Sequence, residues 1–331
     1  MSHVAHFLAD PLPRVPVRRP GSLRRTSSVD MVVGADGGLT LLGRARDPDG
    51  TLASCQALVG RDRLLATLEV QPRVPGSDGL IGRLVGRGFR AAVDGLCAPG
   101  TLGSVLLCEL PVAALLSGYG TLYTGRFPSP MSDEFLAGLP VDICAGWASS
   151  ASMVVRIRDE RSIPTPGGPV SPGDGTPDDE LHDDELHDDE LHDDDDDGSV
   201  VVVGNWHAMP PLAPDSMRRQ RLIERHGTAV WAMFRDSYAR PDGVVTILHE
   251  YSVSAALTDD GSRIASCVAT PRVLPWAECP SAAASAQRIV GQPVSDLRAL
   301  VRDELVGTST CTHLNDLLSS LSQVDHLVSA P

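Results

Sequence analysis

The clearest hydrophobic pattern lies in the last third of the chain, where apolar and polar residues alternate over residues 244–257. One face carries mainly apolar residues together with His249 and Tyr251, and Glu250 falls on the other face. A period of two predicts a β-strand with one buried face. Residues 258–261 form a polar turn and residues 262–270 continue as the return strand, so we expect a hairpin.

Helical signals follow this hairpin. Cys279-Pro280 is typical of a helix start, because proline suits the first helical position, and Gly291 is typical of its end. A second helix is expected after Ser295, and a third near Cys311. Strands followed by helices predict an α+β unit.

The same order of signals occurs earlier in the chain. Leu23-Arg24-Arg25 resembles Met217-Arg218-Arg219, and residues 100–110 align without gaps over residues 307–317. We therefore expect two diverged copies of a strand-hairpin-then-helices unit, the degenerate first copy at 21–159 and the second at 199–331. Residues 1–20 are expected to be a flexible N-terminus.

An acidic, low-complexity segment separates the two copies. Asp-Asp-Glu-Leu-His occurs three times over residues 178–192 and is followed by five Asp. Like charges repel and few apolar groups offset the ordering entropy, so we expect residues 160–198 to be a disordered linker. Its histidines are not preorganised for metal binding, and the segment is interpreted as a solvated repeat.

Charge and cysteine content restrict the function classes. The net charge is −15, and fourteen carboxylates in residues 178–197 account for nearly all of it. No large basic face remains, which argues against a nucleic-acid partner. We predict no secretion signal and no membrane span, and seven scattered cysteines then favour reduced thiols in the cytoplasm.

Candidate chemistry centres on Cys311 and His313, which are expected in the first turn of a helix. Unpaired backbone N–H groups and the helix dipole favour a thiolate there. Cys279, at another helix start, completes a set of soft ligands suited to zinc or an iron–sulfur centre. The alternative is that both cysteines are small buried residues. His249 is either a general base or ligand, or a core histidine with one hydrogen bond.

The first copy lacks these groups, since Ser104 and Leu106 align with Cys311 and His313. A site is therefore expected in the second copy, with the first copy as a scaffold or a surface for a protein partner. Nucleotide-binding loops, a nucleophile elbow and a His-Glu-x-x-His motif are absent from the sequence. No role is assigned to Cys144 or His207.

Four short elements carry a family resemblance: Arg218-Arg219, His249-Glu250-Tyr251, Glu278-Cys279-Pro280 and Cys311-Thr312-His313-Leu314. In this order they resemble the uncharacterised bacterial family catalogued as Domain of Unknown Function 2889, which implies a bacterial protein without an established activity. The layout of the second copy is also similar to the NifU-type iron–sulfur scaffold, although the early strand–strand loop lacks that scaffold's first cysteine.

Three functions are open from the sequence. The first is a metal- or cluster-handling accessory protein with Cys279, Cys311 and His313 as ligands. The second is an enzyme acting on an acyl or thioester group, with Cys311 as nucleophile and His313 or His249 as base. The third is a non-catalytic small-molecule or protein binding module with a cleft between the copies.

Overall fold

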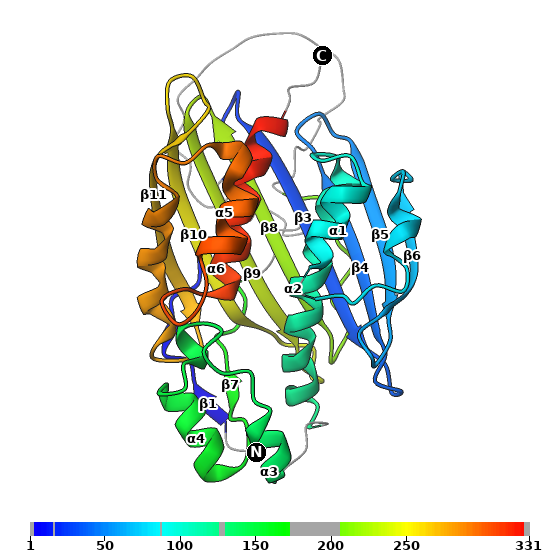
Figure 1. The fold of residues 1–331 in the computed structure, drawn as a ribbon, viewed down its shortest axis with the longest axis vertical. Coiled ribbons are helices and arrows are strands. Elements are labelled where there is room, and N and C mark those ends of the chain that lie inside the picture. Colours follow the sequence, from blue (N-terminus) through cyan, green and yellow to red (C-terminus); the bar gives the residue numbers. More distant parts are fainter. Residues whose placement is uncertain (1–2, 16, 87, 126–129, 173–205, 328–331) are drawn as a thin grey trace, which may run out of the picture.

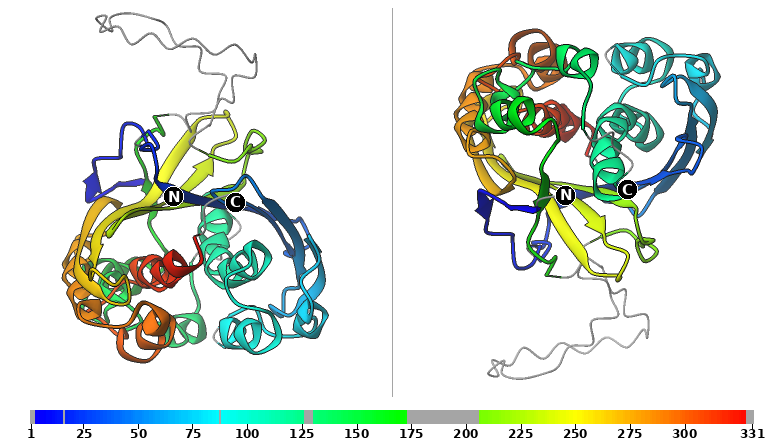
Figure 2. Two further views of the ribbon diagram at one scale, coloured as in Figure 1. Left: turned by 90° about the horizontal axis from the view of Figure 1, so that it is seen from above. Right: turned by 90° about the horizontal axis from the view of Figure 1, so that it is seen from below.

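A computed structural model describes residues 3–15, 17–86, 88–125, 130–172 and 206–327. A large antiparallel sheet runs through it in the strand order β2-β11-β10-β9-β8-β3-β4-β5-β6. The sheet curves around helices that cover one of its faces, as Figures 1 and 2 show. The α+β class expected from the sequence is confirmed.

The first half of the sheet consists of four consecutive antiparallel strands, followed by helices. Its elements are β3 (Leu23–Val33), β4 (Leu39–Arg46), β5 (Leu52–Val59), β6 (Leu65–Gln71), η1 (Ser77–Leu80), α1 (Phe89–Leu96) and α2 (Leu102–Tyr123). Buried positions alternate along β4 and β5, and their inward side chains pack under α2.

The second half repeats this order. Its elements are β8 (Met217–His226), β9 (Ala229–Ala239), β10 (Val245–Leu257), β11 (Ile264–Leu274), η3 (Cys279–Ile289), η4 (Val294–Asp296), α5 (Leu297–Glu304), α6 (Thr312–Ser320) and η5 (Leu321–His326). The predicted hairpin is β10–β11, and the helix expected at Cys279 is a 3-10 helix.

The halves meet where β3 pairs with β8. In this register Ser27 lies opposite Arg221, Arg24 lies opposite Glu224, and Asp30 lies opposite Arg218. Arg24 pairs with Glu224 and Arg218 with Asp30, so matching arginines of the two halves make matching ion pairs across the junction. This arrangement is what a two-fold axis through the β3–β8 pair would produce, and common descent of the halves stays a prediction.

Residues 130–172 pack on the second half, although they follow the first half in sequence. They contain α3 (Asp133–Ala137), η2 (Ala145–Trp147), α4 (Ser152–Glu160) and β7 (Thr165–Gly167). Met131, Ala145 and Val154 belong to the same hydrophobic core as Phe234, Tyr251 and Leu314. The boundary expected at residue 159 therefore does not coincide with a break in packing.

Segments expected to be unstructured are ordered in part. Near the N-terminus, β1 (His3–Ala5) pairs with β7, and β2 (Leu8–Ala9) extends the sheet beside β11. Residues 160–172 contain the end of α4 and all of β7, so the linker cannot begin at residue 160. The acidic repeat lies outside the described residues.

Helix α2 differs from the expectation that no segment reaches the length of a membrane span. Among the described helices it is long and apolar enough to cross a membrane. In this fold most of it is buried, and it packs against β3, β4 and β5. Its apolar sequence is therefore explained by its burial in the core of the first half.

Candidate functional site

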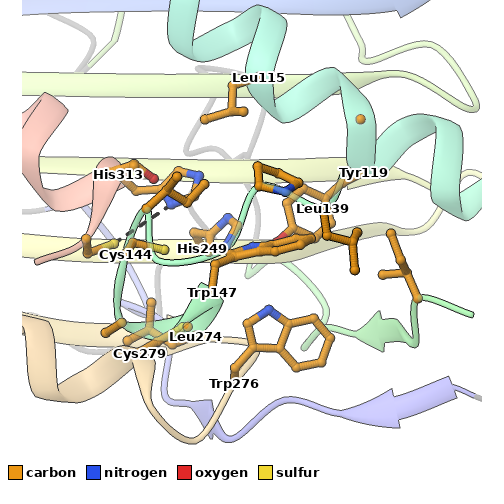
Figure 3. Close-up of a pocket in the computed structure, with 18 of the residues that line it drawn as sticks. Leu115, Tyr119, Leu139, Cys144, Trp147, His249, Leu274, Trp276, Cys279 and His313 are labelled. Carbon is orange, nitrogen blue, oxygen red and sulfur yellow. Dashed lines mark hydrogen bonds between the residues drawn. The ribbon is translucent and has the colours of Figure 1, made fainter. Parts of the chain in front are cut away.

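A cavity of about 240 Å³ lies between α2, the segment 130–172 and the second half of the sheet. Trp147 and Trp276 form part of its wall, and Leu115, Tyr119 and Leu139 contribute further apolar surface (Figure 3). Three distant segments supply these side chains. The cavity exists only in the folded chain, because no stretch of sequence contains more than a part of its wall.

Two imidazoles, those of His249 and His313, line this cavity together; we call them the imidazole pair. Their rings stack with centroids 4.0 Å apart and planes at 22°. His249 comes from β10, next to a β-bulge, and His313 from the first turn of α6. The bulge shifts the register between Ile247 and His249, which sets where the imidazole enters the helix layer.

A buried acid stands behind the imidazole pair. Oδ2 of Asp236 lies 3.4 Å from Nδ1 of His249, without the geometry of a hydrogen bond. Arg219 donates to both carboxylate oxygens of Asp236, over 2.7 and 3.0 Å, and its guanidinium lies 4.1 Å from the centroid of the Phe234 ring. Asp236 is thereby held in place by β8 and faces the imidazole on β10.

Burial dominates the protonation of these groups. It lowers the pKa of His249 well below the ordinary range, and the charge of Arg219 acts in the same direction. Burial and the neighbouring His249 lower the pKa of His313 likewise. Both imidazoles are therefore neutral near pH 7. Burial raises the pKa of Asp236, against the opposing charge of Arg219.

The ion pairs continue from Asp236 toward the sheet junction. Arg219 also donates to Asp316 on α6 over 3.0 Å, and Asp316 accepts further bonds from Arg221 and Arg90. Burial would raise the pKa of Asp316, but these three arginines outweigh it and hold that pKa well below its usual range. Arg221 in turn donates to Glu109 on α2, so both halves hold this cluster.

Three cysteines also line the cavity: Cys144, Cys279 and Cys311. The helix expected near Cys311 is α6; Cys311 is its N-cap residue, just before the first turn, and its sulfur lies 3.8 Å from Nδ1 of His313. Burial raises the pKa of Cys311 to about 12 and that of Cys279 well above its ordinary value. Burial of the sulfur therefore opposes the thiolate expected at this helix start, because loss of hydration disfavours the charged form.

The predicted site residues are partly brought together. Cys279, Cys311, His313 and His249 all line the cavity. In the described part of the chain, however, the donor atoms that converge within 4.8 Å of one another belong to Asp236, His249 and His313. Of the predicted ligand set, this group contains His313 alone.

Asp236, Trp147 and Trp276 were not expected at the site. Asp236 follows Arg235, and the two point to opposite faces of β9, so Arg235 binds Glu250 while Asp236 binds Arg219. The available signal was the Arg-Asp pair that follows the apolar start of this strand. The tryptophans gave no signal, since their roles depend on how residues 130–172 fold back.

Residues 217–326 match the model of a family described as Protein of unknown function (DUF2889). The resemblance expected from the sequence is confirmed for this segment, so the second half of the chain carries this family's domain. No curated protein and no solved structure matches the chain. The likeness to the iron–sulfur scaffold stays a prediction.

Proposed function

We propose that the protein binds a small, largely apolar molecule in this cavity, with one polar oxygen group directed at the imidazole pair. The observation that carries the proposal is an aromatic-walled cavity with two neutral imidazoles on its wall. Pockets of this kind, apolar with few polar groups, are typical of small-molecule sites. An apolar cavity of about 150 Å³ admits benzene, so about 240 Å³ suits a bicyclic ring.

Polar atoms without a partner support the oxygen group. Nδ1 of His249, Nε2 of His313 and Nε1 of Trp276 are buried and have no hydrogen-bond partner in the protein. A buried polar atom left without a partner costs about 1–3 kcal/mol. A ligand that pairs with one of them recovers part of that cost, which selects for an alcohol, phenol or carbonyl over a pure hydrocarbon.

Calorimetric titration with 2-naphthol and 2-methylnaphthalene tests this proposal, because the two probes differ in one polar group. We expect 2-naphthol to bind roughly tenfold more tightly, the worth of about one hydrogen bond. Leu115→Trp fills the cavity from a half-exposed position on α2 and should abolish binding. Leu58→Trp, at an exposed leucine of β5, is the matched control. Unchanged binding by Leu115→Trp would refute the proposal.

The contact of Asp236 with His249 favours a second candidate function, proton transfer to and from the bound molecule. A carboxylate close to one nitrogen of an imidazole, here at 3.4 Å, is an arrangement that general base catalysis can use once a hydrogen bond forms between them. The base would remove a proton from the carbon next to a carbonyl and return a solvent deuteron there. Exchange of the α-hydrogens of 2-tetralone in deuterium oxide, followed by NMR, should be faster with the wild type than with His249→Asn.

The other expectations from the sequence stay proposals. Cys311 as nucleophile is disfavoured by its raised pKa, and Cys279, Cys311 and His313 as a metal set lack convergent donors. Seven free cysteines in the described residues support a reducing compartment such as a bacterial cytoplasm. The repeated order of elements supports an internal duplication.

A further inference from the structure

The group Asp236, His249 and His313 has the composition of a metal site. Each residue offers one donor atom, and these atoms lie within 4.8 Å of one another. Two imidazoles and one carboxylate form a ligand set that suits divalent transition metals and leaves coordination positions open. The neutral imidazole is the form that coordinates a metal.

Unpartnered nitrogens provide an independent observation. Nδ1 of His249 and Nε2 of His313 are both buried without a hydrogen-bond partner, which is costly for histidines that serve only the core. A metal ion would satisfy these atoms. The ring planes, now 22° apart, must open so that both lone pairs point at one ion.

The charge of the surrounding residues determines which further ligand a bound metal ion would favour. The surrounding cluster is formally balanced, with three guanidinium groups and three carboxylates: Arg90, Arg219, Arg221, Glu109, Asp236 and Asp316. A divalent ion adds two positive charges to this balanced, buried cluster. An anionic oxygen on the cavity side of the ion would reduce that excess.

We infer that Asp236, His249 and His313 bind one divalent transition-metal ion at the edge of the cavity, with its open coordination positions toward the bound molecule. The ligand class thus narrows to apolar molecules with an anionic or ionisable oxygen, such as a phenol or carboxylic acid; only this narrowing rests on the proposed function. Cys144, Cys279 and Cys311 are not ligands in this site, so the ion is bound through nitrogen and oxygen atoms.

Cobalt(II) is the probe, because its spectrum separates nitrogen and oxygen ligands from thiolates. The full chain carries His182, His187 and His192 in the acidic repeat, which add weak background binding. The three are replaced by Asn together, with every charge of the repeat retained. We expect this variant to bind one cobalt per chain, with visible d–d bands and no near-ultraviolet band from thiolate-to-cobalt charge transfer.

Variants in that background assign the ligands. His249→Asn and His313→Asn should each weaken cobalt binding at least tenfold, whereas Cys311→Ser and Cys279→Ser should leave it unchanged. His207→Asn is the matched control, since His207 is a buried histidine on the other face of the sheet, bonded to Thr26 and Ser28. A thiolate band that Cys311→Ser removes would overturn the inference, as would equal binding by the two histidine variants and the control.

A second measurement does not depend on the folding of histidine variants. Cobalt quenches the fluorescence of nearby tryptophans, and Trp147 and Trp276 line the cavity. Saturable quenching at one equivalent that is lost in Trp147→Phe/Trp276→Phe would support the site. No quenching in the variant lacking the repeat histidines would refute it.

The two proposals fail separately. Binding of 2-naphthol by metal-free protein without any stoichiometric cobalt site would overturn this inference and leave the proposed function intact. A cobalt site in a protein that binds no naphthol would sustain the inference and remove the proposed function.

Discussion

The two halves of the sheet carry helices in the same order, but they fill the helix-covered face differently. In the first half the side chains under α2 pack closely, because a Cβ added at Gly43 would meet Cys55 Sγ and one at Gly103 would meet Val74 Cγ2. In the second half residues 130–172 form one wall of a partly open cavity. Leu106 is core on one side, while its counterpart His313 is part of a site on the other.

The two halves share one charged junction but differ in the side chains that surround it. The junction is shared, because Arg221 binds Glu109 from the first half and Asp316 from the second. These two acids occupy aligned positions of α2 and α6. The halves therefore keep a common charged centre while only the second half combines it with imidazoles.

The largest expected effect is on the free energy of unfolding, when one of the two acids of the charged centre, Asp316 or Glu109, is removed. Asp316→Ala leaves Arg90, Arg219 and Arg221 without a shared carboxylate, and it should lower the free energy of unfolding by about 3–5 kcal/mol. Glu109→Ala removes the partner of one arginine and of Ser27, so its cost should be smaller. Urea unfolding of both variants measures the difference. Equal losses would mean that the acids are equivalent.

The next effect tests whether the core of the first half tolerates an imidazole at Leu106, the position that aligns with His313. Leu106→His places an imidazole in a closed core, which loses apolar burial and leaves a polar group without a partner. We expect a loss of about 3 kcal/mol in the free energy of unfolding. Leu106→Met, a swap that nearly conserves volume, is the control and should cost less than about 1.5 kcal/mol. A stable Leu106→His protein would show hidden space there.

A moderate effect follows from the lowered pKa values of His249 and His313. The unfolded chain takes up protons as the pH falls below about 6.5, while the folded chain does not. Stability is therefore complete above that pH and falls by about 1.4 kcal/mol per pH unit for each histidine below it.

Burial lowers the pKa of His207 to about 4, so His207 adds to the same slope. His313→Leu, which copies the first half, should remove one histidine's share of the slope between pH 6.5 and 5. Leu106→Val should shift stability without changing the slope. Urea unfolding at several pH values measures both, and an unchanged slope in His313→Leu would contradict the buried neutral imidazole.

The smallest contrast is expected for the cysteines. Burial raises the pKa of both Cys55 in the first half and Cys311 in the second to about 12. At pH 8, iodoacetamide should modify either thiol at least about a hundredfold more slowly than in the urea-unfolded chain. Peptide mapping by mass spectrometry gives both rates. Rapid labelling of Cys311 but not of Cys55 would contradict this prediction and support Cys311 as a nucleophile.

The fold was largely open to prediction because its signals are local. Alternation around Tyr251 predicted β10, the polar turn after it predicted the hairpin, and the helix expected near Cys311 is α6. Pairing of distant strands was not open to prediction. Arg218, Arg219 and Arg221 of β8 are typical of an exposed strand, yet they are buried because this strand lies at the centre of the sheet. Helices cover one face of the sheet there, and segments that include Leu12 and Trp206 pack on the strands as well.

The site was half predictable for the same reason. Its candidate cysteines and histidines lie on predicted elements, and the cavity does collect Cys279, Cys311, His249 and His313. The effect of burial on their chemistry was not open to prediction, because a helix start favours a thiolate most where water or a cation still reaches the sulfur. Burial, which decides the protonation of Cys311, is a property of the whole fold.

The sequence alone determined the order of strands and helices and the α+β class. It also determined the family that residues 217–326 match, and the absence of Cys and His from the aligned positions of the first half. Tertiary structure alone decided that Asp236 joins His249 and His313, and that residues 130–172 form part of the wall of the cavity beside the two histidines. The physical reason is the distance along the sequence over which each effect acts. Periodicity and caps act over a few residues, whereas desolvation and ion pairing depend on which distant segments exclude water together.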